Sequence, residues 1–383
     1  MKQFLQKWFL LEYLKVLIFM LLIFSSHKMI AQNYDENKAN LQKLIDNILE
    51  EIEPNKKPAF GLVIGVIDNG TTYEYAYGRL SKENNTKPNQ HTIFQIGSIS
   101  KVFTSTILMG MVQDSIVRLH DKITDFLPDS LAQQNNWLQN ITLAQLATHT
   151  SGLPKIPYNI SMTITDKENP YSNYQIEDLY HFLGNYEPII VKKKKKNTEF
   201  SYSNLGMGLL GHLLENAAKM SFDSLLNDYI IHPLQLEHTC ITLSEQQQKK
   251  LAIGHYFSGR TIKELTYKTL YSSEGLYSSL SDMIKFVQAN LVIDEKDNIF
   301  RLTHTPLYHT QMRFVKMAYG WFVISKGRKN TPTVITHSGR TGGYSNYVAF
   351  DKEKQIGVVV MSNSAHRIDE IGIEVFEILL ENR

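Results

Sequence analysis

Apolar residues near the N-terminal end of the chain follow the period of β-strands. Residues 59–67 (AFGLVIGVI) form a nearly continuous apolar run, and residues 71–78 (TTYEYAYG) place tyrosines at alternate positions. Asp68, Asn69 and Gly70 separate the two stretches, and Asn-Gly is a strong signal for a tight hairpin turn. We therefore expect an antiparallel hairpin whose second strand carries its tyrosines on one face.

The strand pattern returns near the C-terminal end. Residues 344–351 (YSNYVAFD) and 355–363 (QIGVVVMSN) are joined by a short charged turn. A last helix is expected after them, because Ile371, Val375 and Leu379 lie four residues apart and therefore share one helical face.

Helical spacing dominates the rest of the chain. An apolar stripe at residues 41–52 predicts an amphipathic helix, and residues 99–250 hold several helical patterns broken by prolines. Strands at both ends around a helical middle predict an α/β fold, an antiparallel sheet flanked by helices with a mostly helical second lobe. We expect an α/β lobe from about 37–98 and 255–383, a helical lobe from about 99–254, and a ligand groove between them.

The first residues are typical of an export signal. Lysines precede the apolar run Val16–Phe24, and a polar stretch ends at Ala31. We expect residues 1–31 to be a signal peptide and residues 32–383 to form a periplasmic or secreted protein. The alternative is an uncleaved segment that associates with the membrane, because the apolar stretch can be extended back to Trp8.

Charge and cysteine content exclude several functional classes. The formal net charge is +2, and it becomes −1 without residues 1–31, which hold four lysines and one glutamate. A nearly neutral protein gives no electrostatic reason to expect a nucleic-acid partner. Cys240 is the only cysteine, so no internal disulfide is possible, and we expect a small buried apolar residue there.

The sequence predicts no metal site and no organic cofactor. The run Lys192–Lys196 is expected to be a solvated loop or, alternatively, a contact for anionic envelope polymers.

A lysine inside an apolar stretch is the first indication of chemistry. In GSISKVF, Lys101 follows Ser98 by three residues, so both side chains lie on one face if a helix begins there. An amine becomes a base for a serine hydroxyl when burial lowers its pKa, and Val102, Phe103 and Ile107 would supply that burial. The Ser98 backbone N–H would then lie at a helix N-terminus, where it could stabilise an oxyanion. The structural alternative for Ser98 is a helix N-cap.

A second polar centre is found in FSYSN. Tyr202 could share proton transfer with Lys101 as a tyrosinate or as a hydrogen-bonded phenol, and Asn204 could orient both the lysine and a substrate carbonyl. Neither pattern is specific alone, since Y-S-N recurs at 171–173 and 344–346. S-x-x-K likewise recurs within the first 31 residues.

The third polar stretch is THSGRTGGYSNYVAF. His337, Ser338 and Gly339 begin what is expected to be an edge strand, along which a substrate could align. The Arg340 backbone N–H could be a second oxyanion donor. Elsewhere, His149 invites a Ser–His interpretation, although a structural turn is expected there, and Trp321 is expected in the core.

Together, the three stretches resemble the β-lactamase-related serine hydrolases, which include class C β-lactamases, DD-peptidases, D-aminopeptidases and related esterases. S-x-x-K is a signature of penicillin-recognising enzymes. The resemblance covers nearly all of the chain after residue 31, and further similar stretches are LATHTSGLP (146–154), EGLYSSLSDMIKF (274–286) and QIGVVVMSN (355–363).

The resemblance implies a serine β-lactamase/transpeptidase-like fold and a role for each matching residue. Ser98 would be the acylated nucleophile, Lys101 and Tyr202 the catalytic proton-transfer pair, and Asn204 an orienting amide. Residues 337–339 would form the third motif, where class C β-lactamases carry lysine instead of His337. Lysine offers a fixed charge to a β-lactam carboxylate, whereas histidine is only partly charged near neutrality.

The sequence therefore predicts an exported serine hydrolase that acts through a Ser98 acyl-enzyme on an amide or ester bond. The expected substrate is a D-amino-acid peptide, of the kind cleaved by DD-carboxypeptidases or D-aminopeptidases, or an ester. Arg340 could compensate for the missing lysine, so a class C-like β-lactamase stays open as an alternative. So does a non-catalytic sensor of cell-wall fragments or β-lactams.

Overall fold

The computed structural model describes residues 32–51, 60–187, 200–293, 298–325, 327 and 331–381. The chain divides into two compact units, residues 1–54 and 55–383. Residues 32–51 form one helix, which confirms the predicted helix as far as residue 51. None of the described helices is long and apolar enough to cross a membrane. The predicted signal peptide and the lysine run 192–196 lie outside the described residues.

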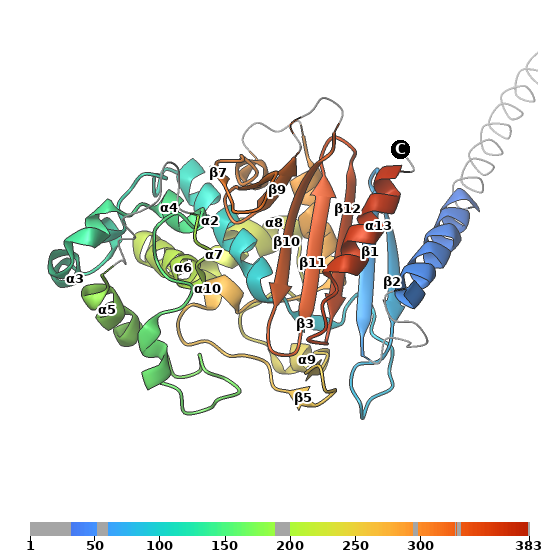
Figure 1. Cartoon of the computed structure of the whole chain (residues 1–383), viewed down its shortest axis with the longest axis horizontal. Coiled ribbons are helices and arrows are strands. Elements are labelled where there is room, and N and C mark those ends of the chain that lie inside the picture. The colour runs from blue at the N-terminus through green and yellow to red at the C-terminus, as the bar shows by residue number, and fades with distance from the viewer. Residues whose placement is uncertain are drawn as a thin grey trace, which may run out of the picture. The chain divides into compact units, whose positions relative to one another are not determined.

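An antiparallel sheet organises the described part of the second unit (Figure 1). Its eight strands lie in the order β2-β1-β12-β11-β10-β9-β8-β7. Their bounds are β1 (Leu62–Asp68), β2 (Thr71–Tyr77), β7 (Tyr308–His309), β8 (Val315–Met317), β9 (Phe322–Ser325), β10 (Thr333–Arg340), β11 (Ser345–Asp351) and β12 (Ile356–Ser362).

Local sequence explains how the first strands of this sheet pair. The predicted hairpin is confirmed: β1 pairs with β2, and the turn between them holds Asn69 and Gly70 at φ values of 48° and 79°. Asparagine and glycine tolerate this left-handed backbone better than other residues. The other edge of β1 pairs with β12, so strands from both ends of the chain meet in one sheet, as predicted.

Helices fill the middle of the chain and cover the sheet. Two helices pack on it directly: α11 contacts β1 and β12, and α13 contacts β11 and β12. Figure 1 shows many of the other helices gathered beside the sheet. The α-helices are α2 (Ser100–Gln113), α3 (Asp129–Gln134), α4 (Leu143–Ala147), α5 (Ile176–Asn185), α6 (Asn204–Ala218), α7 (Phe222–Leu226), α8 (His232–Leu234), α9 (Glu245–Gln248), α10 (Tyr271–Glu274), α11 (Leu280–Leu291), α12 (Ile299–Leu302) and α13 (Asp369–Glu381).

Shorter elements connect these layers. Two small antiparallel sheets pair β3 (Ile93–Gln95) with β6 (Tyr277–Ser279) and β4 (Gly254–His255) with β5 (Thr261–Ile262). The single helical turns are η1 (Gly97–Ile99), η2 (Ile123–Phe126), η3 (Asn136–Asn140), η4 (Tyr158–Met162) and η5 (Asn227–Ile231). The predicted fold class, an antiparallel sheet flanked by helices with a helical region between its strands, is confirmed.

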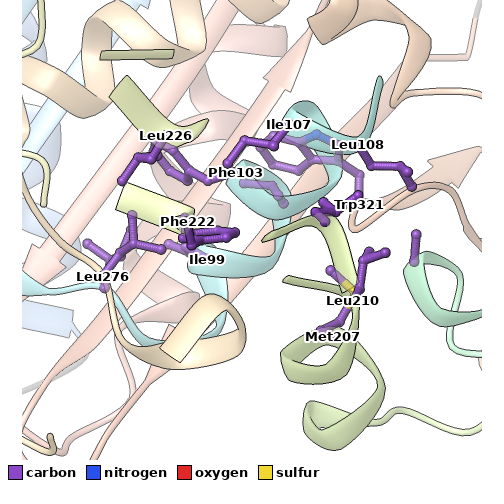
Figure 2. Close-up of a cluster of buried hydrophobic side chains, with 14 of the residues drawn as sticks. Ile99, Phe103, Ile107, Leu108, Met207, Leu210, Phe222, Leu226, Leu276 and Trp321 are labelled. Atoms are coloured by element: carbon purple, nitrogen blue, oxygen red, sulfur yellow. The ribbon is translucent and has the colours of Figure 1, made fainter. Parts of the chain in front are cut away.

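Helix α2 lies in the middle of the hydrophobic core. All of its residues from Ser100 to Met111 are buried, which is typical of a helix packed on every side. Figure 2 shows its apolar side chains among those of α6, α7 and Trp321. Trp321 is fully buried, as predicted. This packing fixes the start of α2, where Ser98 and Lys101 lie.

Candidate active site

Ser98 and Lys101 are brought together at the entrance of α2. Ser98 lies in η1, and the Lys101 amine donates hydrogen bonds to Ser98 Oγ at 3.0 Å and to the Ser273 carbonyl at 2.8 Å. Neither η1 nor α2 has a side-chain N-cap, and the N-cap positions are Ile96 and Ile99. The alternative of a capping serine is therefore wrong.

Burial changes the chemistry of Lys101. The side chain is fully buried, and this burial lowers the pKa of its amine to about 8. The negative charge of Glu274 opposes this effect and the positive charge of Lys155 adds to it. An amine with such a pKa is partly neutral near pH 7 and can accept a proton.

Tyr202 completes the group from a distant segment. Its phenol lies beside Ser98, and the Lys101 amine lies 5.1 Å from the centre of its ring. Burial raises the phenol pKa above its usual value; the neighbouring Ser98 side chain lowers it, and the charge of Glu274 raises it further. The phenol is therefore the favoured form, and the tyrosinate that the sequence left open is disfavoured.

His149 packs against Tyr202 and binds the residue that follows it. Its Nδ1 accepts a hydrogen bond from the Ser203 N–H at 3.1 Å, and its ring centre lies 4.4 Å from that of Tyr202. Burial, together with the charges of Lys101 and His337, holds the pKa of His149 well below its ordinary value. A neutral His149 thus positions the segment that carries Tyr202. The sequence analysis expected only a structural turn at His149 and did not predict this contact.

Strand β10 brings the third polar stretch to the same place. It pairs with β11 as far as Arg340, but with β9 only over Thr333–Thr336. The expected edge is therefore confirmed for residues 337–340, but these residues end the strand instead of beginning it: β10 starts at Thr333, and residues 333–336 lie inside the sheet. The free edge of residues 337–340 leaves backbone groups available to a substrate.

Two glycines allow the backbones at this edge to meet. Gly97 has φ +53°, and a Cβ there would lie 2.8 Å from the Arg340 nitrogen. A Cβ on Gly339 would lie 1.9 Å from the Ile96 carbonyl oxygen. No larger residue fits at either position without movement of the backbone. Arg340 N thus lies beside the turn that carries Ser98, an arrangement that suits two oxyanion donors.

His337 and Asn204 are buried in this region with unpaired polar atoms. His337 Nδ1 is hydrogen-bonded with the Ser338 carbonyl at 2.7 Å, whereas His337 Nε2 and Asn204 Oδ1 have no partner among the described residues. Burial, helped by the charge of Lys101, lowers the pKa of His337 to about 3, although the bond to Ser338 opposes this. His337 is therefore neutral. The second partner of Lys101 is the Ser273 carbonyl rather than the predicted Asn204 amide.

These residues surround a cleft of about 1010 Å³. Lys101 and Gly339 lie behind its surface, and the other predicted residues line it, namely Ser98, Tyr202, Asn204, His337, Ser338 and Arg340. Within the described ranges, no group of His, Cys, Asp and Glu side chains is arranged to hold a metal ion. Cys240 is half-buried rather than fully buried, and burial raises the pKa of its thiol to about 12, so the thiol is unreactive.

Comparison with known proteins identifies the family. The family model described as Beta-lactamase matches residues 41–378. The chain belongs to this β-lactamase family. A β-lactamase of Escherichia coli K12 is 27% identical over 343 residues, covering 82% of this chain and 85% of the relative. A β-lactamase of Pseudomonas fluorescens is 25% identical over 355 residues, covering 85% of this chain and 94% of the relative.

Solved structures of the β-lactamase family share the fold. A β-lactamase/D-alanine carboxypeptidase from Pseudomonas syringae superposes with a TM-score of 0.75 at 20% identity, over 90% of this chain and 99% of that one. A class C β-lactamase from Rhodobacter sphaeroides superposes with a TM-score of 0.72 at 22% identity, over 89% of this chain and 98% of that one. The predicted serine β-lactamase/DD-peptidase fold is confirmed, and the chain is a β-lactamase-related serine hydrolase.

Five charged residues of the cleft were missed by the sequence analysis, namely Lys155, Glu274, Arg367, Asp369 and Glu377. The Asp369 carboxylate accepts hydrogen bonds from Ser338 Oγ and from Arg367 Nε. Glu274 begins the family-like stretch 274–286. That resemblance marked the residue as part of the matching region, but it did not predict the contact of Glu274 with Ser98.

Proposed function

We propose that this β-lactamase-family enzyme cleaves amide or ester bonds through an acyl-enzyme on Ser98. The observation that carries the proposal is the hydrogen bond from the Lys101 amine to Ser98 Oγ, with the centre of the Tyr202 ring 5.1 Å from the same amine. When Lys101 is neutral, its amine takes the Ser98 proton while Oγ attacks the substrate carbonyl carbon. The backbone N–H groups of Ser98 and Arg340 stabilise the oxyanion that forms.

The second half of the reaction returns the proton. Tyr202 donates its phenol proton to the leaving amine or alkoxide as the bond to the acyl carbon breaks, and Lys101 restores the proton to Tyr202. Water then attacks the acyl carbon, the same pair accepts its proton, and Ser98 Oγ leaves and is reprotonated. The carboxylic acid product is released. Asn204 is the group assigned to orient the substrate, because it lines the cleft and its buried Oδ1 has no partner among the described residues.

The third motif favours a D-amino-acid peptide or an ester over a β-lactam. His337 is neutral because its pKa is about 3, so it offers no fixed charge to a β-lactam carboxylate. The structural relative from Pseudomonas syringae, described as a β-lactamase/D-alanine carboxypeptidase, carries both activities in its name. We also propose export with removal of residues 1–31, which N-terminal sequencing of the protein from the cell envelope tests.

A substrate panel tests this assignment. We expect kcat/KM for p-nitrophenyl acetate, which carries no carboxylate, to exceed kcat/KM for a chromogenic cephalosporin, whose carboxylate meets the neutral His337. A D-alanyl-D-alanine peptide, which also ends in a carboxylate, tests the peptidase activity separately. A cephalosporin rate well above both others would instead make the protein a β-lactamase. An acyl adduct that lasts for hours without turnover of any substrate would make it a sensor.

A further inference from the structure

Glu274 is an acidic residue in direct contact with the nucleophile. It ends α10, is half-buried and lines the cleft, and its carboxylate accepts a hydrogen bond from Ser98 Oγ at 3.1 Å. Across the described residues, this is the only hydrogen bond of the Glu274 carboxylate, and no salt bridge reaches it. The mechanism proposed above gives this carboxylate no task.

Acylation removes the partner of Glu274. Once Oγ carries an acyl group it has no hydrogen to donate, so the carboxylate loses its one hydrogen bond in a partly buried place. An anion left without a donor there is costly. A substrate that brings its own donor to Glu274 would avoid this cost, and a positively charged donor would avoid it best.

The position of Glu274 indicates which part of a substrate it meets. In an acyl-enzyme of an amino acid, the α-amino nitrogen is only a few bonds from Oγ, within reach of a carboxylate that already contacts Oγ. The arginines of the cleft do not replace Ser98 as a donor to Glu274, because both pair with Asp369. Arg340 Nη2 lies 4.0 Å and Arg367 Nε 3.3 Å from Asp369 Oδ2. Lys155 makes no ion pair with Glu274 among the described residues.

We propose that Glu274 binds the free ammonium group of the substrate's acyl moiety, so that the preferred substrates are peptides, amides or esters of amino acids with an unblocked amino group. This inference rests on the proposed acyl-enzyme function. It assigns to Glu274 the choice of substrate, and it excludes acyl groups that carry a carboxylate or a blocking group at that position.

The electrostatics of the site agree with this assignment. The charge of Glu274 raises the pKa of Lys101 against the larger effect of burial, and so favours the protonated amine in the free enzyme. An ammonium group at Glu274 offsets that charge and draws the carboxylate away from the Ser98 hydroxyl. Binding of the correct substrate therefore favours the neutral Lys101 and frees the Ser98 proton for it.

A matched pair of substrates tests the proposal. D-Alanine p-nitroanilide and its N-acetyl derivative differ only in the ammonium group. We expect wild-type kcat/KM to favour the free amine by about 10-fold to 100-fold, the range of a hydrogen bond between charged groups. Glu274→Gln should bring this ratio close to one, and Glu274→Asp, which keeps the charge, should restore part of it. Thermal unfolding of each variant checks that it folds.

Two results would overturn the proposal. One is a wild-type preference for the acetylated substrate; the other is an equal loss on both substrates in Glu274→Gln, which would assign Glu274 to proton transfer or to structure. Calorimetric binding of D-alaninamide and N-acetyl-D-alaninamide to Ser98→Ala and to the double variant Ser98→Ala/Glu274→Gln decides recognition without turnover. Failure of the acyl-enzyme function alone would leave this difference in binding intact, and equal binding of the two amides would contradict the proposal.

Discussion

Replacement of Lys101 by methionine is expected to lower kcat/KM by about 10²-fold to 10⁴-fold, the contribution typical of a general base. Methionine has a similar length and suits the apolar surroundings of α2, where Val102 and Phe103 are fully buried. It cannot take a proton from Ser98 Oγ. The Ser273 carbonyl loses a donor, but the cost of burying an amine disappears as well, so we expect a far smaller change in stability than in activity.

The pH profile of the wild-type enzyme belongs to the same prediction. Burial holds the pKa of Lys101 at about 8, and the base must be neutral to act. Wild-type kcat/KM should therefore rise with pH toward about 8 and level off above it. Lys316→Met, which changes a lysine of β8 that does not line the cleft, serves as the control. Wild-type rates in Lys101→Met would show that another group is the base.

Tyr202→Phe is expected to lower kcat/KM by about 10²-fold to 10⁴-fold, because the leaving group then lacks its proton donor. The ring itself stays, with its contacts to His149 at 4.4 Å and Phe322 at 6.3 Å between ring centres. The expected loss therefore reports the hydroxyl rather than packing. Steady-state rates on the D-alanyl peptide measure it most clearly, since an amine is the poorer leaving group.

Tyr344→Phe provides a matched control for Tyr202→Phe. Tyr344 belongs to another Y-S-N triplet, and its buried hydroxyl donates to the Ala252 carbonyl at 2.7 Å. Its removal leaves that carbonyl without this donor, which should cost about 1–3 kcal/mol of stability. The activity of the folded fraction should change little. Equal losses of activity in both variants would remove Tyr202 from the mechanism.

The predicted fold followed from patterns that act locally. The Asn69-Gly70 turn sets the β1–β2 hairpin, and the apolar runs of β11 and β12 read directly as buried strands. The limited pairing of β9 with β10 was not predictable in this way, because the length of a strand pair depends on tertiary packing. The same holds for the partial burial of Cys240.

Within the site, sequence reasoning found the residues whose side chains define a motif. It proposed Ser98, Lys101 and Tyr202, which the structure brings together. It missed the Ser273 carbonyl that holds Lys101, because a backbone group carries no residue signal. It also missed the contact between Ser98 and Glu274, which lie 176 positions apart and meet only through the packing of α10.

The central claim is that Ser98 carries the acyl group during turnover. Mass spectrometry of peptides from enzyme quenched during p-nitrophenyl acetate hydrolysis tests it most directly. We expect an acetyl adduct on Ser98 in the wild type and in the control Ser105→Ala, which changes another buried serine of α2, and no adduct in Ser98→Ala. An adduct that persists in Ser98→Ala, or that maps to a different residue, would contradict the account.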